Sequence, residues 1–158
     1  MAAHTHTVLV VDDDEPIRRI VGLWVERLGY GLRAAESAEA ALHLLETEDI
    51  DVVICDVRMP GADGIWLTDR IHELFPRVPV MLATGLGGVD RSITLRPGVA
   101  AYVVKPFSRE EMSFAIQTGV AWRETQMSRP DQFFVIVESP PPLAEWCGRK
   151  AALACQSR

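Results

Sequence analysis

The sequence has few of the features that would suit it to a membrane, to an oxidising compartment or to nucleic acid. No apolar run approaches the roughly 18–20 residues that cross a bilayer, and the first residues lack the basic and apolar segments of a signal peptide. Three cysteines, an odd number without a CxxC pair, favour a reducing cytoplasm. The net charge of −6 gives no basis for direct nucleic-acid binding. We therefore expect a cytoplasmic protein that contacts neither membrane nor nucleic acid directly.

What is present is the composition of an ordinary globular protein. Hydrophobic residues make up 48% of the 158 residues and charged residues 24%, so a core of useful size is available. This length fits one domain with an extension better than two domains. We expect a domain over residues 6–124 and a C-terminal extension of unknown role over 125–158.

Short apolar runs alternate with helical patterns along the domain. The runs at 8–11, 52–55, 78–83 and 101–104 are almost continuously apolar, as in strands that are buried on both faces of a parallel sheet. A weaker run at 31–35 suits an edge strand. The alternation predicts five βα units and an α/β, doubly wound parallel sheet.

Helical spacing between these runs supplies the covering layers. The first helix begins with Pro16, ends at the cap residue Gly29, and has an apolar stripe expected to face inward: Ile17, Ile20, Val21, Trp24, Val25 and Leu28. The second helix opens at Ser37. The third spans about 64–75, with Ile71, Leu74 and Phe75 expected to be buried. A capping box at 108–111 opens the last helix, which continues to about Glu124.

Two segments depart from this regular pattern. The stretch from Gly85 to Gly98 contains two more glycines and a proline, so we expect its helix to be short or mobile. In the extension, residues 133–137 predict a strand that pairs with a sheet edge, either its own or that of a second copy in a homodimer. A disordered remnant or a linker to a further domain is the alternative for this extension. Residues 143–154 suit a short helix. His4 and His6 are expected to lie in a disordered terminus.

Polar residues follow the predicted strands at their carboxyl ends, where ligands bind in open parallel sheets. Asp12 and Asp13 follow the first strand, Asp56 the third, Thr84 the fourth and Lys105 the fifth. Clustered carboxylates repel one another and therefore need a hard cation such as Mg²⁺. An ionised aspartate can attack phosphorus, while a lysine and a metal offset the charge of the transferring oxygens. The set therefore predicts aspartyl-phosphate chemistry.

Four stretches closely resemble the receiver domains of bacterial two-component response regulators, over roughly residues 6–124. They are VLVVDDDEP at 8–16, DVVICDVRMPGADG at 51–64, PVMLATG at 79–85 and YVVKPF at 102–107. The resemblance implies a flavodoxin-like, five-stranded sheet in the order 2-1-3-4-5, a Mg²⁺ ion, and a histidine kinase or histidine phosphotransfer protein as phosphoryl donor. It also implies a cis peptide bond before Pro106.

The resemblance assigns a role to each matching residue. Asp56 matches the phosphoacceptor, which is also a metal ligand, and Lys105 and Thr84 match the lysine and hydroxyl that contact the phosphoryl group. Three further positions complete the set: Asp12 and Asp13 match the acidic metal pair, and Arg58 the residue whose backbone carbonyl is a metal ligand. Tyr102 matches the switch aromatic.

Several functions remain open at this point. The leading interpretation is a stand-alone signalling switch, not an enzyme in its own right, that acts on an unknown downstream protein. A phosphorelay shuttle is a variant of it. A Mg²⁺-dependent phosphatase of the haloacid dehalogenase type would use a D-x-D motif, which Asp12 and Asp14 formally provide. A docking module that is never phosphorylated is the last alternative. After Glu124 there is no helix-turn-helix, nucleotide-cyclase or HD pattern.

Overall fold

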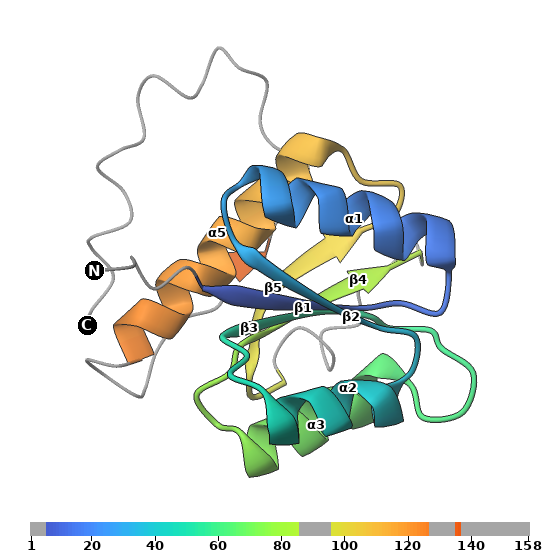
Figure 1. Cartoon of the computed structure of the whole chain (residues 1–158), viewed down its shortest axis with the longest axis vertical. Coiled ribbons are helices and arrows are strands. Elements are labelled where there is room, and N and C mark those ends of the chain that lie inside the picture. The colour runs from blue at the N-terminus through green and yellow to red at the C-terminus, as the bar shows by residue number, and fades with distance from the viewer. Residues whose placement is uncertain (1–5, 86–95, 127–134, 137–158) are drawn as a thin grey trace.

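The computed structural model describes residues 6–85, 96–126 and 135–136, which form one parallel sheet between two layers of helices (Figure 1). In chain order the elements are β1 Thr7–Val11, α1 Glu15–Arg27, β2 Gly31–Ala35, α2 Ala38–Thr47, β3 Val52–Asp56, α3 Gly64–Leu74, β4 Val80–Thr84, β5 Val99–Val104, α5 Arg109–Gln126 and β6 Val135–Ile136. The strand order is β2-β1-β3-β4-β5-β6. The predicted order of the first five strands is confirmed, and β2 is an edge strand as expected.

The sheet divides the core into two layers because successive strand residues point to opposite faces. On one face Val8, Val10, Ile54 and Met81 pack beneath α1 and α5. On the other face Leu9, Val11, Val53, Cys55 and Leu82 pack beneath α2 and α3. Figure 1 shows the same division, with α1 and α5 on one side of the sheet and α2 and α3 on the other. Both faces are therefore covered, which explains the continuous apolar runs.

Side-chain caps start the helices where the sequence predicts them. The carboxylates of Asp14 and Asp63 accept hydrogen bonds from the backbone of α1 and α3, and the Ser37 hydroxyl does so for α2. The predicted capping box of α5 is present, with Ser108 and Glu111 each bonding the other's backbone N–H. Gly29 follows α1 with a φ of 87°, a conformation that glycine adopts without strain.

Two residues predicted to be buried are exposed. Ile20 on α1 is 45% exposed and Leu74 at the end of α3 is 55% exposed. The apolar stripe of α1 is wider than the strip of sheet that this helix covers, so Val21 and Val25 fill the contact and Ile20 faces outward. Leu74 lies in the last turn, beyond the edge of the core that holds Ile71.

Both irregular segments lie largely outside the described residues. The expected short helix between Gly85 and Gly98 falls mainly on residues 86–95, and the expected helix at 143–154 also falls outside. Of the run at 133–137, Val135–Ile136 form β6, which pairs parallel to β5 at Ala101 and Tyr102. This sixth strand lies on the sheet's own edge. Among the described residues, no helix combines the length and apolar character needed to span a membrane.

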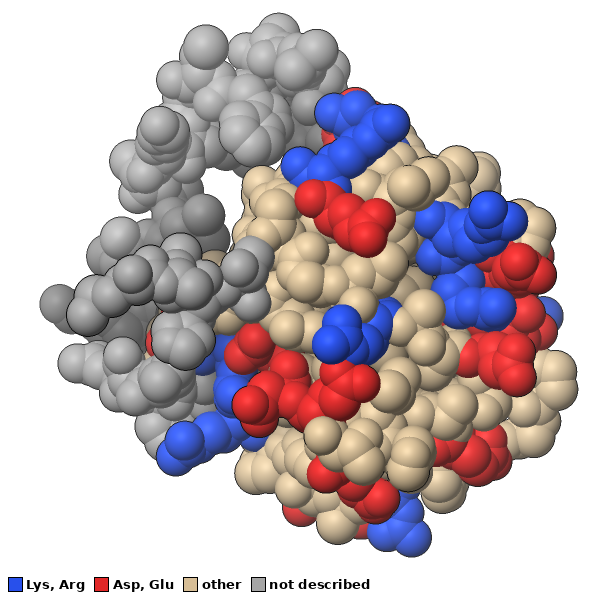
Figure 2. All heavy atoms as spheres, viewed as in Figure 1, with Lys and Arg blue, Asp and Glu red and all other residues tan. Residues whose placement is uncertain are grey.

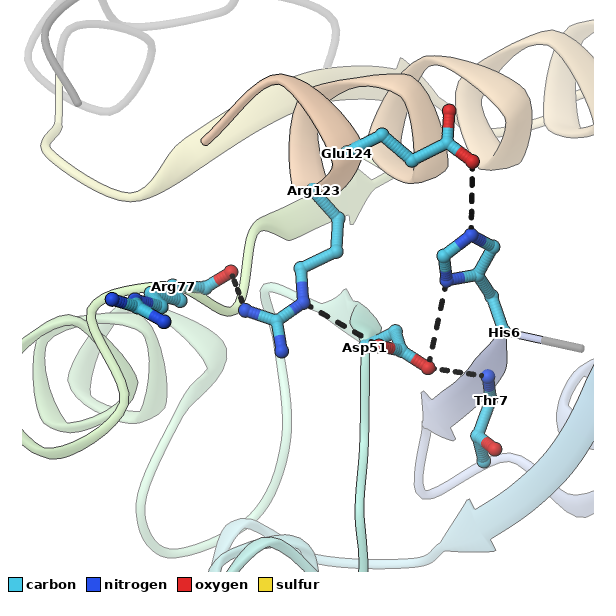
Figure 3. Close-up of polar contacts among 6 residues, drawn as sticks. All are labelled: His6, Thr7, Asp51, Arg77, Arg123 and Glu124. Carbon is cyan, nitrogen blue, oxygen red and sulfur yellow. Dashed lines mark hydrogen bonds and ion pairs between the residues drawn. The ribbon is translucent and has the colours of Figure 1, made fainter. Parts of the chain in front are cut away.

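A polar network ties the end of α5 to the amino ends of β1 and β3 (Figure 3). Arg123 Nε lies 3.4 Å from an Asp51 carboxylate oxygen, and the other oxygen accepts a hydrogen bond of 2.9 Å from the Thr7 backbone. The His6 ring lies 3.0 Å from a Glu124 oxygen and 3.7 Å from Asp51. The prediction of a disordered terminus is thus wrong for His6, while His4 lies outside the described residues.

Arg123 also donates a hydrogen bond of 2.8 Å to the backbone carbonyl of Arg77, in the loop before β4. We call these six residues, His6, Thr7, Asp51, Arg77, Arg123 and Glu124, the basal network. It joins four parts of the chain at the end of the sheet that lies opposite the predicted site.

Candidate functional site

The strand ends bring the predicted polar residues together as the sequence implies. Asp12 directly follows β1, Asp56 ends β3 and Thr84 ends β4, while Lys105 directly follows β5. These strands are neighbours in the sheet and run parallel, so their carboxyl ends meet at one edge. Asp12, Asp56 and Thr84 are almost fully buried, at 5%, 7% and 1% exposure. Polar groups enclosed to this degree need partners.

Lys105 supplies part of that partnership. Its Nζ atom lies 3.1 Å from a carboxylate oxygen of Asp12 and 3.1 Å from one of Asp56. The peptide bond between Lys105 and Pro106 is cis, in agreement with the expectation. The Lys105 backbone N–H donates to the Thr84 carbonyl at 2.5 Å, which joins the ends of β5 and β4. One ammonium group thus bridges two carboxylates that come from different strands.

Three carboxylates surround this single cation. Asp12, Asp13 and Asp56 each have an oxygen within 4.8 Å of the others, and we call these residues the acidic cluster. Asp13 is exposed, so the cluster opens to solvent on its side. Oxygen donors at this spacing, with more negative than positive charge, fit a hard divalent cation that retains some of its water. The residues present could therefore hold Mg²⁺.

The ionisation of the site reflects this crowding. Burial raises the pKa of the Asp56 carboxyl above its ordinary value; the Lys105 hydrogen bond and charge oppose the rise, and the charges of Asp12 and Asp13 add to it. Burial lowers the pKa of Lys105, but its hydrogen bonds to Asp12 and Asp56 outweigh that effect and leave it raised. Lys105 is therefore protonated at neutral pH, whereas burial and the two neighbouring carboxylates oppose the ionisation of Asp56. A further cation at this site would favour the ionised form of Asp56.

The backbone around Asp12 is held by contacts that the sequence did not reveal. Arg18 Nη1 donates a hydrogen bond of 2.6 Å to the Asp12 carbonyl, and the Asp14 N–H donates one of 2.9 Å to the Asp12 side chain. The Asp14 carboxylate turns to the helix and accepts from Ile17 N–H at 3.3 Å. Asp14 therefore caps α1, as its place before Pro16 suggests. No sequence pattern indicated the role of Arg18, because its partner is a main-chain atom.

Gly64 allows α3 to begin directly against the end of β3. A Cβ atom at this position would lie 2.1 Å from the Asp56 carbonyl oxygen, which no side chain can accommodate. The Gly64 N–H also donates to the Val57 carbonyl at 3.0 Å. The close approach fixes the backbone that carries Asp56. The sequence placed Gly64 in a motif without indicating this role.

The remaining predicted residues lie around the acidic cluster. Arg58 is exposed in the loop after β3, which borders an open hollow of about 560 Å³ lined by Val57, Arg58, Met59, Pro60, Gly61 and Asp63. Tyr102 is only 3% exposed and stands opposite Leu82 in the neighbouring strand. Since Leu82 and Thr84 are two residues apart, Tyr102 and Thr84 share one face of the sheet. The tyrosine is thus buried in the core.

Comparisons with known proteins agree with this geometry. The family described as "Response regulator receiver domain" matches residues 8–117. The chain is 44% identical over 101 residues to response regulator protein FleR of Pseudomonas aeruginosa, covering 63% of this chain and 21% of that protein. It is 40% identical over 111 residues to the probable transcriptional regulator ycf27 of Guillardia theta, covering 70% and 43%. The chain thus spans less than half the length of these relatives.

Solved structures show the same fold. The receiver domain protein from Methanospirillum hungatei JF-1 aligns with a TM-score of 0.71 and 26% identity, covering 77% of this chain and 98% of that one. The receiver domain of the Francisella response regulator 1452 aligns with a TM-score of 0.67 and 30% identity, covering 77% and 99%. On its site geometry, its fold and its family match, the chain belongs to the response regulator receiver domains of two-component systems.

Proposed function

We propose that the chain accepts a phosphoryl group on Asp56, in a Mg²⁺-dependent reaction, from a histidine kinase or a histidine phosphotransfer protein. The observation that carries this proposal is the enclosure of the Asp56 carboxylate between the Lys105 ammonium and the other two aspartates. A buried carboxylate whose pKa is raised, with a cation beside it, is typical of a functional site and supports this assignment. Family membership supports the same interpretation.

In the proposed reaction an oxygen of Asp56 attacks phosphorus, and the bond from phosphorus to the donor's histidine nitrogen breaks. Lys105 stays within reach of Asp56 and compensates the charge of the transferring oxygens. Asp13 would hold Mg²⁺ directly and Asp12 mostly through water, with the Arg58 carbonyl as a further ligand. The metal, when bound, lowers the electrostatic barrier to bringing a phosphoryl anion beside three carboxylates.

Phosphorylation would act on protein contacts through Thr84 and Tyr102. The Thr84 hydroxyl lies at the end of β4, where it could donate a hydrogen bond to a phosphoryl oxygen. Tyr102 shares its sheet face, so a movement of Thr84 changes the space beside the ring. Since Tyr102 is buried in this structure, we propose that phosphorylation stabilises this inward position within an existing equilibrium.

The exposed apolar residues of α1 suggest where the histidine protein docks. Ile20 and Leu23 are 45% and 52% exposed, on the helix that begins beside the acidic cluster. Exposed apolar side chains next to a reaction centre are typical of a protein interface. An apolar surface on the donor's helix would thus bring its phosphohistidine to Asp56.

The alternatives receive less support. Asp14 caps α1, which removes the second carboxylate that a phosphatase D-x-D motif would need. Transfer onward to another histidine protein, as in a relay, would use the same Asp56 chemistry and remains the second candidate.

The relatives named as transcriptional regulators are longer, so DNA binding, if it applies here, would belong to a longer protein. On the face in Figure 2 the described basic and acidic side chains are interspersed.

Incubation with acetyl phosphate, followed by intact mass, tests the proposal. The wild-type chain should gain one phosphoryl group with Mg²⁺ and none with EDTA, and Asp56→Asn should gain none. Asp51→Asn is the matched control, since that aspartate lies in the basal network and should leave labelling intact. Normal labelling of Asp56→Asn would refute the assignment. Steady hydrolysis of a generic phosphomonoester by the wild type would favour the phosphatase instead.

A further inference from the structure

The edge of β5 carries a strand that the five-stranded receiver arrangement does not include. Val135–Ile136 pair with Ala101 and Tyr102 in parallel register. Without this pairing the β5 backbone would present open N–H and C=O groups on that side, since its other neighbour is β4. An exposed edge of this kind accepts extended segments, and the run Phe133 to Val137 has the apolar, strand-forming composition that suits it.

The basal network fixes the position of the end of α5, where the C-terminal extension (here called the tail) begins. Arg123 and Glu124 hold the end of α5 against Asp51 and His6, at the amino end of the sheet (Figure 3). A strand parallel to β5 must begin at that same end. Eight residues separate α5 from β6, which completes a strand–helix–strand unit of the usual kind. The end of α5 therefore lies at the same end of the sheet as the start of a strand that runs parallel to β5.

β5 also links this edge to the reaction centre. Tyr102 is paired with Leu82 on one side and with Ile136 on the other. Three residues after Tyr102, directly beyond the end of β5, Lys105 bonds Asp56 through its side chain and Thr84 through its backbone. A displacement of Lys105 or Tyr102 therefore moves backbone to which β6 is bonded.

The pairing is short enough to respond to such a displacement. The net free energy that each hydrogen bond contributes is similar in size to the entropy cost of ordering one residue. The docked and undocked states of a two-residue strand should therefore have similar free energies. A coupling of ordinary size between the two sites would then shift the docked population clearly.

We propose that the β5 edge is a strand-docking surface, that its occupant is the chain's own segment around Val135–Ile136, and that phosphorylation of Asp56 strengthens this docking. The coupling rests on the proposed function; the docking itself does not. Its direction follows from the structure, in which Tyr102 is inward and β6 is paired at the same time. By reciprocity, a docked tail favours the phosphorylated state.

Amide exchange measured by NMR on the full chain tests the docking. Replacing both Val135 and Ile136 by proline removes the N–H groups that a strand needs, and proline at Glu138, outside the paired residues, is the control. We expect amides of Ala101 to Val103 to exchange about tenfold faster in the double variant than in the control, equivalent to about 1.4 kcal/mol. Equal exchange in both would overturn the docking. Protection that grows with protein concentration would instead assign the occupant to a second copy.

Beryllofluoride with Mg²⁺ tests the coupling. It should slow exchange at Val135 and Ile136 several-fold in the wild type, and the double variant should bind it several-fold more weakly. Fluorine NMR reports beryllofluoride binding independently of the tail. If the wild type does not bind it, the proposed function fails while the docking result stands. If it binds and tail exchange and affinity are unchanged, the coupling fails alone.

Discussion

The two polar clusters lie at opposite ends of one sheet and differ in charge balance. At the carboxyl ends, the three aspartates of the acidic cluster share the single ammonium of Lys105. At the amino ends, the two carboxylates of the basal network face the Arg123 guanidinium and the His6 ring. The first cluster has surplus negative charge at buried positions, and the second has a cationic or hydrogen-bonding partner for each carboxylate.

This difference is the one we expect between the proposed reaction centre and a structural clamp. Buried surplus charge destabilises the folded state unless a ligand compensates it. Such charge is therefore retained mainly at sites that bind a ligand. Balanced pairs at the surface contribute modestly to stability and call for no ligand. Both clusters consist of strand-end and helix-end residues, so position alone would not tell them apart. Substitutions at both ends of the sheet test the contrast.

The largest difference between the two ends should come from removing the cation of each cluster. Lys105→Ala should slow phosphorylation by acetyl phosphate about 10²–10³-fold, because the transferring oxygens lose their fixed positive neighbour. Arg123→Ala should change the rate less than about threefold, since its partners are structural. Intact-mass time courses measure both rates. Equal slowing in the two variants would break the contrast.

Backbone packing should differ between the ends as well. Gly64→Ala forces a methyl group onto the Asp56 carbonyl and should lower the free energy of unfolding by about 3 kcal/mol. At the amino end, Gly31→Ala meets the Thr7 hydroxyl at 3.2 Å, and that side chain can shift. Its effect should stay below about 1 kcal/mol. Urea unfolding compares them, and a tolerated Gly64→Ala would refute the close approach.

Metal affinity should depend on the acidic cluster alone. Asp13→Ala should weaken Mg²⁺ binding by roughly 10–100-fold, in line with other disrupted metal sites. Asp14→Ala should weaken it far less because that carboxylate caps α1, and Asp51→Asn should leave it unchanged. Titration calorimetry gives all three values. Equal losses for Asp13 and Asp14 would show that the register of the metal ligands is wrong.

The basal network should matter for stability without affecting the reaction. Asp51→Asn loses the ion pair with Arg123 and weakens the hydrogen bond from the Thr7 backbone. Its free energy of unfolding should fall by about 1 kcal/mol. Thermal unfolding measures the change, with Asp49→Asn, an exposed neighbour, as control. A loss of phosphorylation in folded Asp51→Asn would contradict a purely structural role.

The smallest effect should have the opposite sign. Because the pKa of Asp56 is raised in the folded state, the stability contribution of this group is present at low pH and lost as pH rises through the folded pKa. Asp56→Asn should therefore be slightly more stable than wild type at pH 7 without Mg²⁺, and the advantage should vanish in acid. Urea midpoints across pH test this. A destabilised Asp56→Asn at pH 7 would show that the Lys105 pairing outweighs burial.

The acidic cluster could be predicted from the sequence because the order of the strands along the chain determines which residues meet. Once the parallel strands are assigned, Asp12, Asp56 and Lys105 must meet at one sheet edge. The basal network could not be predicted from the sequence, because His6 and Glu124 are 118 residues apart and neither ends a strand. The exposure of Ile20 depends on how α1 sits on the sheet, which periodicity does not determine. The clash at Gly64 likewise exists only once α3 is packed against β3.

The most direct test of the account is to locate the phosphoryl group chemically. After reaction with acetyl phosphate and Mg²⁺, borohydride reduces an aspartyl phosphate to homoserine, and peptide mass spectrometry identifies the residue. We expect homoserine at position 56 alone, with the other aspartates of the acidic cluster unmodified. Homoserine at Asp12 or Asp13, or no homoserine in a chain that has gained a phosphoryl group, would contradict it.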